Sequence, residues 1–217
     1  YTVTVERGKE YRPRVQHVAV GVEPVTLRLP LHRWVNMAAR GWYSGETHIH
    51  RTIDDLRNVV IAEDLNASFP LSFWVTKAFA SPTAGDKSEK GVVPEGLVAV
   101  DATHVIWPRN TEYEIFTVGG KQHTLGALFL LNHRSILAEG VPPWGPVARK
   151  AAAEGALLDM DKLDWPFSLS LPHSTGAGLY ELANNHVWRR EFGFTDWVSI
   201  APPFLQPPRG GKRGGER

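Results

Sequence analysis

The sequence predicts an α/β domain preceded by a few strands of a β-sandwich-like domain. Near the N-terminus, apolar and polar side chains alternate with a period of two, whereas from residue 40 onward short strand-like segments alternate with helical ones. The first pattern is typical of half-buried strands, and the second is typical of an α/β layered domain or barrel. The expected units are the sandwich-like strands over 1–39, the α/β domain over 40–197, and a flexible tail or truncated loop over 198–217.

The N-terminal unit is expected to contain a strand over 1–5, a turn over 8–11 and further strands over 15–31, interrupted at Gly21 and Pro24. Tyr1 opens a strand-like run without a signal peptide before it, so the true N-terminus is expected to lie upstream. The tail over 198–217 is rich in Pro, Gly and Arg and has little apolar material to offset the entropy of ordering it.

The α/β unit is justified by its own elements. Apolar positions in residues 54–65 and 146–156 follow helical spacing, and these two segments are expected to be helices. Apolar runs bounded by Gly, Pro and Ser are expected to be strands, and they cover residues 69–79, 97–107, 112–118 and 125–131.

Composition narrows the function classes. With 217 residues, 42% of them hydrophobic, the chain can bury a core. Its 24 basic and 23 acidic residues leave a net charge of +1, which favours a small-molecule substrate over nucleic acid. The absence of cysteine excludes disulfides, thiolate zinc sites and a cysteine nucleophile. No apolar run approaches the roughly 20 residues of a membrane span. The sequence leaves the oligomeric state and the location open, and an extracytoplasmic location is among the alternatives.

Two histidines, His48 and His50, are the strongest chemical signal. In an extended segment, residues two apart point to the same face, so both imidazoles can meet one divalent ion while Ile49 faces the core. The alternative is a chance pair on an exposed strand. The position of the pair, between an apparent strand and a helix, favours the metal, because ligands commonly bind at such ends of strands.

Glu114 and His123 are the candidate partners of this pair. Glu114 is a carboxylate among strand-forming residues, and His123 precedes the apolar run over 125–131. Together with His48 and His50 they would complete a ligand set of imidazoles and a carboxylate. Each also has an ordinary interpretation, Glu114 as a solvent-facing strand residue and His123 as a loop residue after the turn at 119–120.

Residues 41–50, Gly-Trp-Tyr-Ser-Gly-Glu-Thr-His-Ile-His, resemble the opening motif of the polymerase-and-histidinol-phosphatase (PHP) superfamily, especially its CehA/McbA-like metallohydrolase branch. The resemblance extends from about residue 40 to about residue 193. It implies an incomplete, distorted β/α barrel and hydrolysis of an ester or phosphoester at bound metal, namely Zn, Mn or Fe. It also implies that His48, His50, Glu114 and His123 are the ligands, and that the final Asp-x-His motif of the family lies beyond this chain.

The chain departs from the family at Lys77, which stands in Thr76-Lys77-Ala78-Phe79 where the family has Thr-Asp-His-Asn. A cation there implies one ion or none, with Lys77 at the edge of the histidine pocket; the alternative is a lysine that extends into solvent. A later family histidine corresponds either to residues 161–164 or to His173. His173 or Lys162 would assist proton transfer or charge stabilisation. A second hypothesis is a non-catalytic binding or scaffold protein in which Lys77 and Lys162 replace metal ions.

Overall fold

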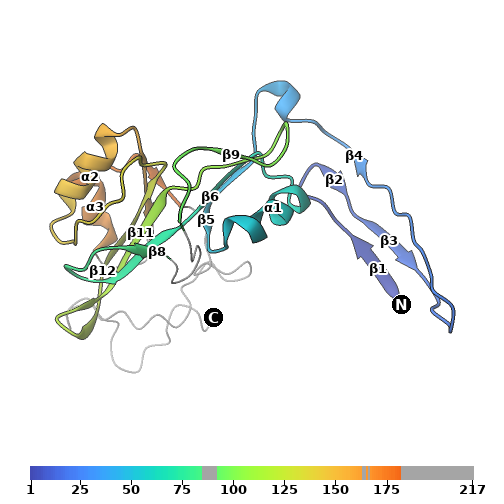
Figure 1. The fold of residues 1–217 in the computed structure, drawn as a ribbon, viewed down its shortest axis with the longest axis horizontal. Helices are drawn as coiled ribbons and strands as arrows, with labels where there is room; N and C mark the ends of the chain where they lie inside the picture. The colour runs from blue at the N-terminus through green and yellow to red at the C-terminus, as the bar shows by residue number, and fades with distance from the viewer. Residues whose placement is uncertain (85–91, 163–164, 166, 182–217) are drawn as a thin grey trace.

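The protein is a mixed α/β structure in which strands predominate (Figure 1), as the sequence predicts at this level. The computed structural model describes residues 1–84, 92–162, 165 and 167–181. Across these residues the strands form one six-stranded sheet, one four-stranded sheet and two two-stranded sheets. All of these sheets are open, so the described part of the chain contains no closed barrel.

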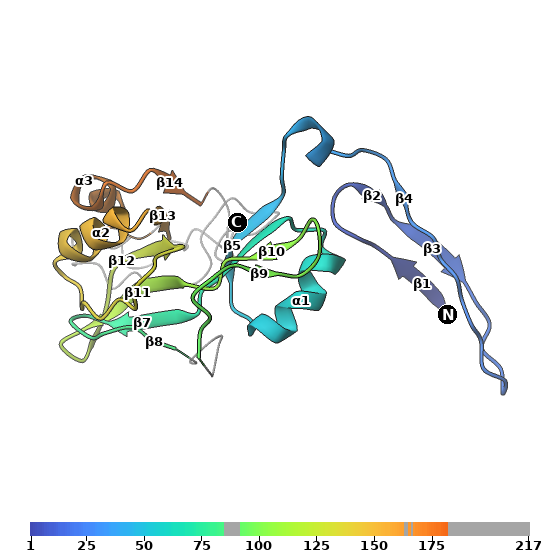
Figure 2. The same cartoon turned by 45° about the horizontal axis from the view of Figure 1, so that its top comes forward.

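The N-terminal residues 1–36 form an extended arm that projects from the rest of the molecule (Figures 1 and 2). Its strands pair in two short antiparallel ladders, β1 (Thr2–Val5) with β3 (Arg14–His17) and β2 (Tyr11–Arg12) with β4 (His32–Arg33). The strand expected over 1–5 is confirmed as β1, and β3 overlaps the start of the range 15–31. The rest of that range, residues 18–31, forms no strand, and β2 and β4 lie outside the expected strands. Most of their side chains are exposed, and no second sheet packs on them among the described residues.

The arm is anchored to the body at Gly8. Its N–H donates to the carbonyl of Ala62 at 3.2 Å, and Arg7 donates to the Asp64 carboxylate at 2.9 Å. Gly8 has φ +46°, and a Cβ there would lie 2.6 Å from the carbonyl oxygen of Glu63. Only glycine fits this approach, because it adopts positive φ without strain and leaves room for the neighbouring backbone.

The four-stranded sheet carries the histidine pair. Its strand order is β5-β6-β10-β9, and β5 follows a short 3-10 helix, η1. Helix α1 begins after Thr52, whose side chain accepts a hydrogen bond from the N–H of Asp55, as an N-cap residue does. Its apolar side packs on Ile49 and Ile106. The bounds are η1 Ala38–Arg40, β5 Gly45–Ile49, α1 Ile53–Ala62, β6 Ala67–Pro70, β9 Val98–Ala99 and β10 Val105–Ile106.

The six-stranded sheet has the order β14-β13-β12-β11-β7-β8. Strands β11 and β12 form a long hairpin around Gly119 and Gly120, which have φ +57° and +74°. Two consecutive glycines in this conformation suit a tight hairpin turn. The bounds are β7 Phe73–Lys77, β8 Thr83–Ala84, β11 Asn110–Val118, β12 Lys121–Leu131, β13 Leu157–Asp161 and β14 Leu179–Tyr180.

One face of this sheet is apolar and is covered by α2 (Trp144–Ala153) and α3 (Leu171–Thr175), which follows the 3-10 helix η2 (Ser168–Ser170) (Figure 2). Tyr113 and Leu128 lie at the centre of this core and are fully buried. Among the described helices, none has the length and apolar character needed to cross a membrane. The tail expected to be flexible, over 198–217, lies outside the described residues.

Candidate metal centre

The opposite face of the six-stranded sheet is lined with buried acids, and we call Glu112, Glu114, Asp159 and Asp161 the acidic face. Glu112 and Glu114 lie two apart on β11, and Asp159 and Asp161 lie two apart on β13, so each pair points to one side. The register across β12 aligns them, because Phe129 pairs with both Glu112 and Asp159. All four acids are at most 5% exposed. Such burial requires compensating partners.

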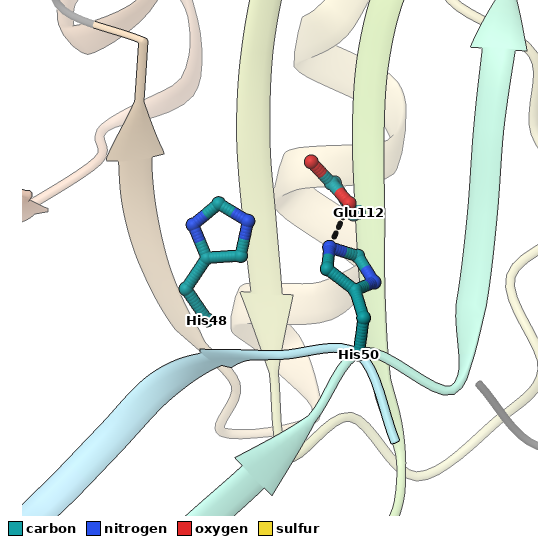
Figure 3. A group of neighbouring side chains, drawn as sticks. All are labelled: His48, His50 and Glu112. Carbon is teal, nitrogen blue, oxygen red and sulfur yellow. Dashed lines mark ion pairs between the residues drawn. The ribbon is translucent and has the colours of Figure 1, made fainter. Parts of the chain in front are cut away.

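His48 and His50 lie over the acidic face at the end of β5 (Figure 3). The β5–β6 pairing is irregular between Glu46 and Ile49, and the His48 ring packs on Phe129 with 4.9 Å between ring centroids. His50 Nε2 lies 3.2 Å from Glu112 Oε2. Ligand atoms of His48, His50 and Glu112 all lie within 4.8 Å of one another, so the three side chains can hold one metal ion.

The other side of the His48 ring meets Glu181, which follows β14. His48 Nδ1 lies 3.3 Å from Glu181 Oε2, and His48, Asp161 and Glu181 form a second group of ligand atoms within 4.8 Å. Burial lowers the pKa of His48, but the carboxylates of Glu181 and Asp161 outweigh it, so the pKa is raised. Burial foremost, together with Asp161, raises the pKa of Glu181 to about 7. Because Nδ1 of His48 contacts Glu181, Nε2 of the same ring points toward His50 and Glu112.

A buried lysine, Lys162, completes the centre. Its side chain is 1% exposed, and its ammonium contacts the carboxylates of Asp161, of Glu114 at 3.3 Å and of Glu112 at 3.7 Å. Burial opposes the charge of Lys162, but these three carboxylates outweigh it and raise the pKa of the ammonium. Burial raises the pKa of Asp161, and the ammonium outweighs that effect and lowers it. The three carboxylates therefore favour the charged form of Lys162 within the acidic face.

The predicted ligands Glu114 and His123 lie in neither group of ligand atoms. Glu114 accepts a hydrogen bond from Trp74 Nε1 at 3.1 Å and pairs with Lys162. His123 lies at the start of β12, and its ring stacks on Phe167 with 5.3 Å between centroids. Glu112 takes the ligand position that was expected for Glu114. Both side chains point to the same side of β11, but His50, at the end of β5, contacts Glu112.

The remaining candidates lie apart from the histidine pair, except for Lys162. Lys77 is exposed at the end of β7, so the expected position beside the histidines is corrected; the buried cation facing Glu114 is Lys162. His173 is exposed on α3, which packs on the apolar face of the sheet, and the sheet separates it from the acidic face.

Sequence reasoning did not assign Glu112, Asp161 or Glu181 as candidate ligands. A signal for the first two is present, because Glu112-Tyr113-Glu114 and Asp159-Met160-Asp161 each place acids two apart with an apolar residue between them. In a strand, that pattern gives an acidic side and an apolar side. Glu181 reaches His48 only through the pairing of β14 with β13, a contact that no local pattern encodes.

The donor set suits a divalent ion. Two imidazoles and a carboxylate are ligands of zinc and of similar metals. Within the described residues, Nδ1 of His50 and Oδ1 of Asp159 are buried without a hydrogen-bond partner, and Nε2 of His50 has only the ion-pair contact with Glu112. Burial foremost, together with the neighbouring Asp161, raises the pKa of Asp159 to about 6. Buried polar atoms in this condition are rare unless water or an ion serves them.

A cavity of about 700 Å³ gives access to the histidines. It is lined by residues of the arm, of β5 and of α1, including Trp42, Tyr43, His48, His50 and Arg51. Trp42 and Tyr43 are 70% and 71% exposed, so they present free aromatic surface beside the pair. This volume fits a small molecule.

No protein-family model, no curated protein and no solved structure matches this chain. The functional assignment therefore depends on the side chains of the centre.

Proposed function

We propose that the protein is a metal-dependent hydrolase that acts on an ester or a phosphoester. The observation that carries the proposal is the convergence of His48, His50 and Glu112, whose ligand atoms lie within 4.8 Å of one another beside a cavity. The resemblance of residues 41–50 to the PHP motif supports the same chemistry. The proposal includes the fold implied by that resemblance, a distorted β/α barrel to which the described open sheets would contribute.

His48, His50 and Glu112 would hold one divalent ion, Zn, Mn or Fe. Such an ion lowers the pKa of a water molecule toward neutrality and polarises the scissile bond. Glu181 fixes the orientation of the His48 ring through Nδ1, and Lys162 neutralises part of the charge of Glu112. The cavity lined by His48, His50 and Arg51 would admit the substrate.

A second candidate is a non-catalytic binding or scaffold protein. Lys162 favours it, because its ammonium already pairs with three of the four acids of the acidic face. On this hypothesis the lysine replaces metal, and the cavity binds a small molecule without chemistry. Turnover after metal reconstitution distinguishes the two candidates.

The hydrolase proposal is tested with bis(p-nitrophenyl) phosphate and p-nitrophenyl acetate, after reconstitution of the full chain with Zn²⁺, Mn²⁺ or Fe²⁺. We expect turnover of at least one substrate, and its loss to the background rate in the His48→Ala/His50→Ala double variant, because both imidazole ligands are removed. His32→Ala is the matched control, since His32 is exposed on the arm. Equal rates in the parent and the double variant would count against the proposal.

A further inference from the structure

The acidic face holds a cation of its own. Lys162 follows β13 directly, and its ammonium meets carboxylates from two different strands, Asp161 on β13 and Glu112 and Glu114 on β11. Carboxylates converging from separate strands on one buried point are the arrangement that divalent cations use in proteins. Here an ammonium lies at that point.

The backbone of Lys162 has an uncommon conformation. Lys162 has φ +55°, a conformation that side-chain-bearing residues rarely adopt. Its carbonyl accepts hydrogen bonds from the N–H of Trp165 at 2.9 Å and from Ser168 Oγ at 2.5 Å, which hold this carbonyl in place. Uncommon backbone conformations held in this way cluster at functional sites.

Glu112 links the carboxylates around Lys162 to the candidate metal ligands His48 and His50. One oxygen of Glu112 faces His50 and the other faces Lys162, so a single carboxylate joins the two positions. Glu112, Glu114 and Asp161 together carry three negative charges, and Lys162 returns one positive charge. The net charge of these four side chains is therefore −2, which one divalent cation would neutralise.

We infer that Lys162 takes the place of a second divalent ion and limits the centre to one. The inference deepens the proposed function, because it assumes an ion at His48, His50 and Glu112 for the parent protein. The role of Lys162 can be tested separately, because it predicts that the parent and a variant without the lysine bind different numbers of metal ions. A second ion beside the fixed ammonium would be repelled by it and would find Glu114 and Asp161 already paired.

The test replaces Lys162 with methionine, which fills similar space without charge. We expect Lys162→Met to bind one more Mn²⁺ or Zn²⁺ per chain than the parent, by calorimetry and by elemental analysis after removal of excess metal. We also expect its melting temperature to rise more with added metal, because the ion relieves repulsion among three buried carboxylates. Lys162→Arg keeps the charge, and Lys77→Met removes an exposed lysine; both should keep the stoichiometry of the parent. An unchanged stoichiometry in folded Lys162→Met overturns the inference.

A second variant decides the case if Lys162→Met does not fold. Glu114→Gln in the parent background removes a partner of Lys162 that is in neither group of ligand atoms. We expect the same metal stoichiometry as the parent. Two ions in the parent and one in Glu114→Gln would show that a metal, rather than the lysine, uses this carboxylate, and would overturn the inference. A parent without metal together with Lys162→Met that binds one ion would refute the proposed function and support the role of Lys162.

Discussion

Replacing Glu112 with glutamine is expected to weaken binding of a divalent ion by at least about 100-fold. Glu112 is fully buried and supplies the only carboxylate of the His48, His50 and Glu112 group. Glutamine has nearly the same shape, so the packing between β7 and β12 is kept while the charge is lost. Loss of a residue that merely orients a ligand costs about 10- to 100-fold in metal affinity, and loss of a ligand costs at least as much.

The affinity of the Glu112→Gln variant is measured by competition with a chelator of known affinity, with Zn²⁺ as the probe. Glu23→Gln is the matched control, because it makes the same chemical change at a residue that is exposed on the arm. Circular dichroism of both variants establishes that the fold is retained. An affinity within a factor of two of the parent would remove Glu112 from the ligand set.

Replacing Leu128 with alanine is expected to lower the free energy of unfolding by about 2 to 5 kcal/mol, because it leaves a cavity at the centre of the core. Leu128 is fully buried on β12, where it pairs in register with Tyr113 on β11 and Met160 on β13. Its side chain belongs to the cluster that α2 covers. The surrounding strands cannot collapse freely, because they also fix the acidic face on their other side.

Urea unfolding followed by circular dichroism measures this change. Leu169→Ala is the control: Leu169 is 78% exposed on η2, and its loss should change the free energy of unfolding by less than about 0.5 kcal/mol. A loss below about 1 kcal/mol for Leu128→Ala would mean that the apolar face is packed differently.

Elements whose signal is local were predictable from the sequence. The helix expected over 54–65 is α1, Ile53–Ala62, and the helix expected over 146–156 is α2, Trp144–Ala153. The hairpin turn at Gly119 and Gly120 was signalled by its residue types. In each case the pattern is contained within about ten residues, as helical periodicity and turn chemistry are.

Changes of sheet were not predictable. The apolar run over 69–79 suggested one strand, but β6 ends at Pro70, β7 begins at Phe73, and the two belong to different sheets. Leu71 between them is 1% exposed, so hydrophobicity continues through the break. Strand pairing depends on contacts between distant segments, and an apolar run carries no information about which partner each half will choose.

The same limit explains which parts of the centre were predictable. His48 and His50 share a side because of their spacing, which the sequence shows directly. The choice between Glu112 and Glu114 depends on how far the end of β5 reaches along β11. The buried lysine is Lys162, which follows Asp161 directly and contacts carboxylates of β11 and β13, whereas Lys77 is exposed at the end of β7.

The metal content of the full chain tests the central claim most directly. The protein is treated with chelator, reconstituted with Zn²⁺, Mn²⁺ or Fe²⁺, desalted and analysed for metal, with the His48→Ala/His50→Ala double variant in parallel. We predict one ion per chain in the parent and none in the double variant, because two of the three ligands in the first group are then absent. A folded parent that retains no ion, or a double variant that retains as much metal as the parent, would contradict the claim.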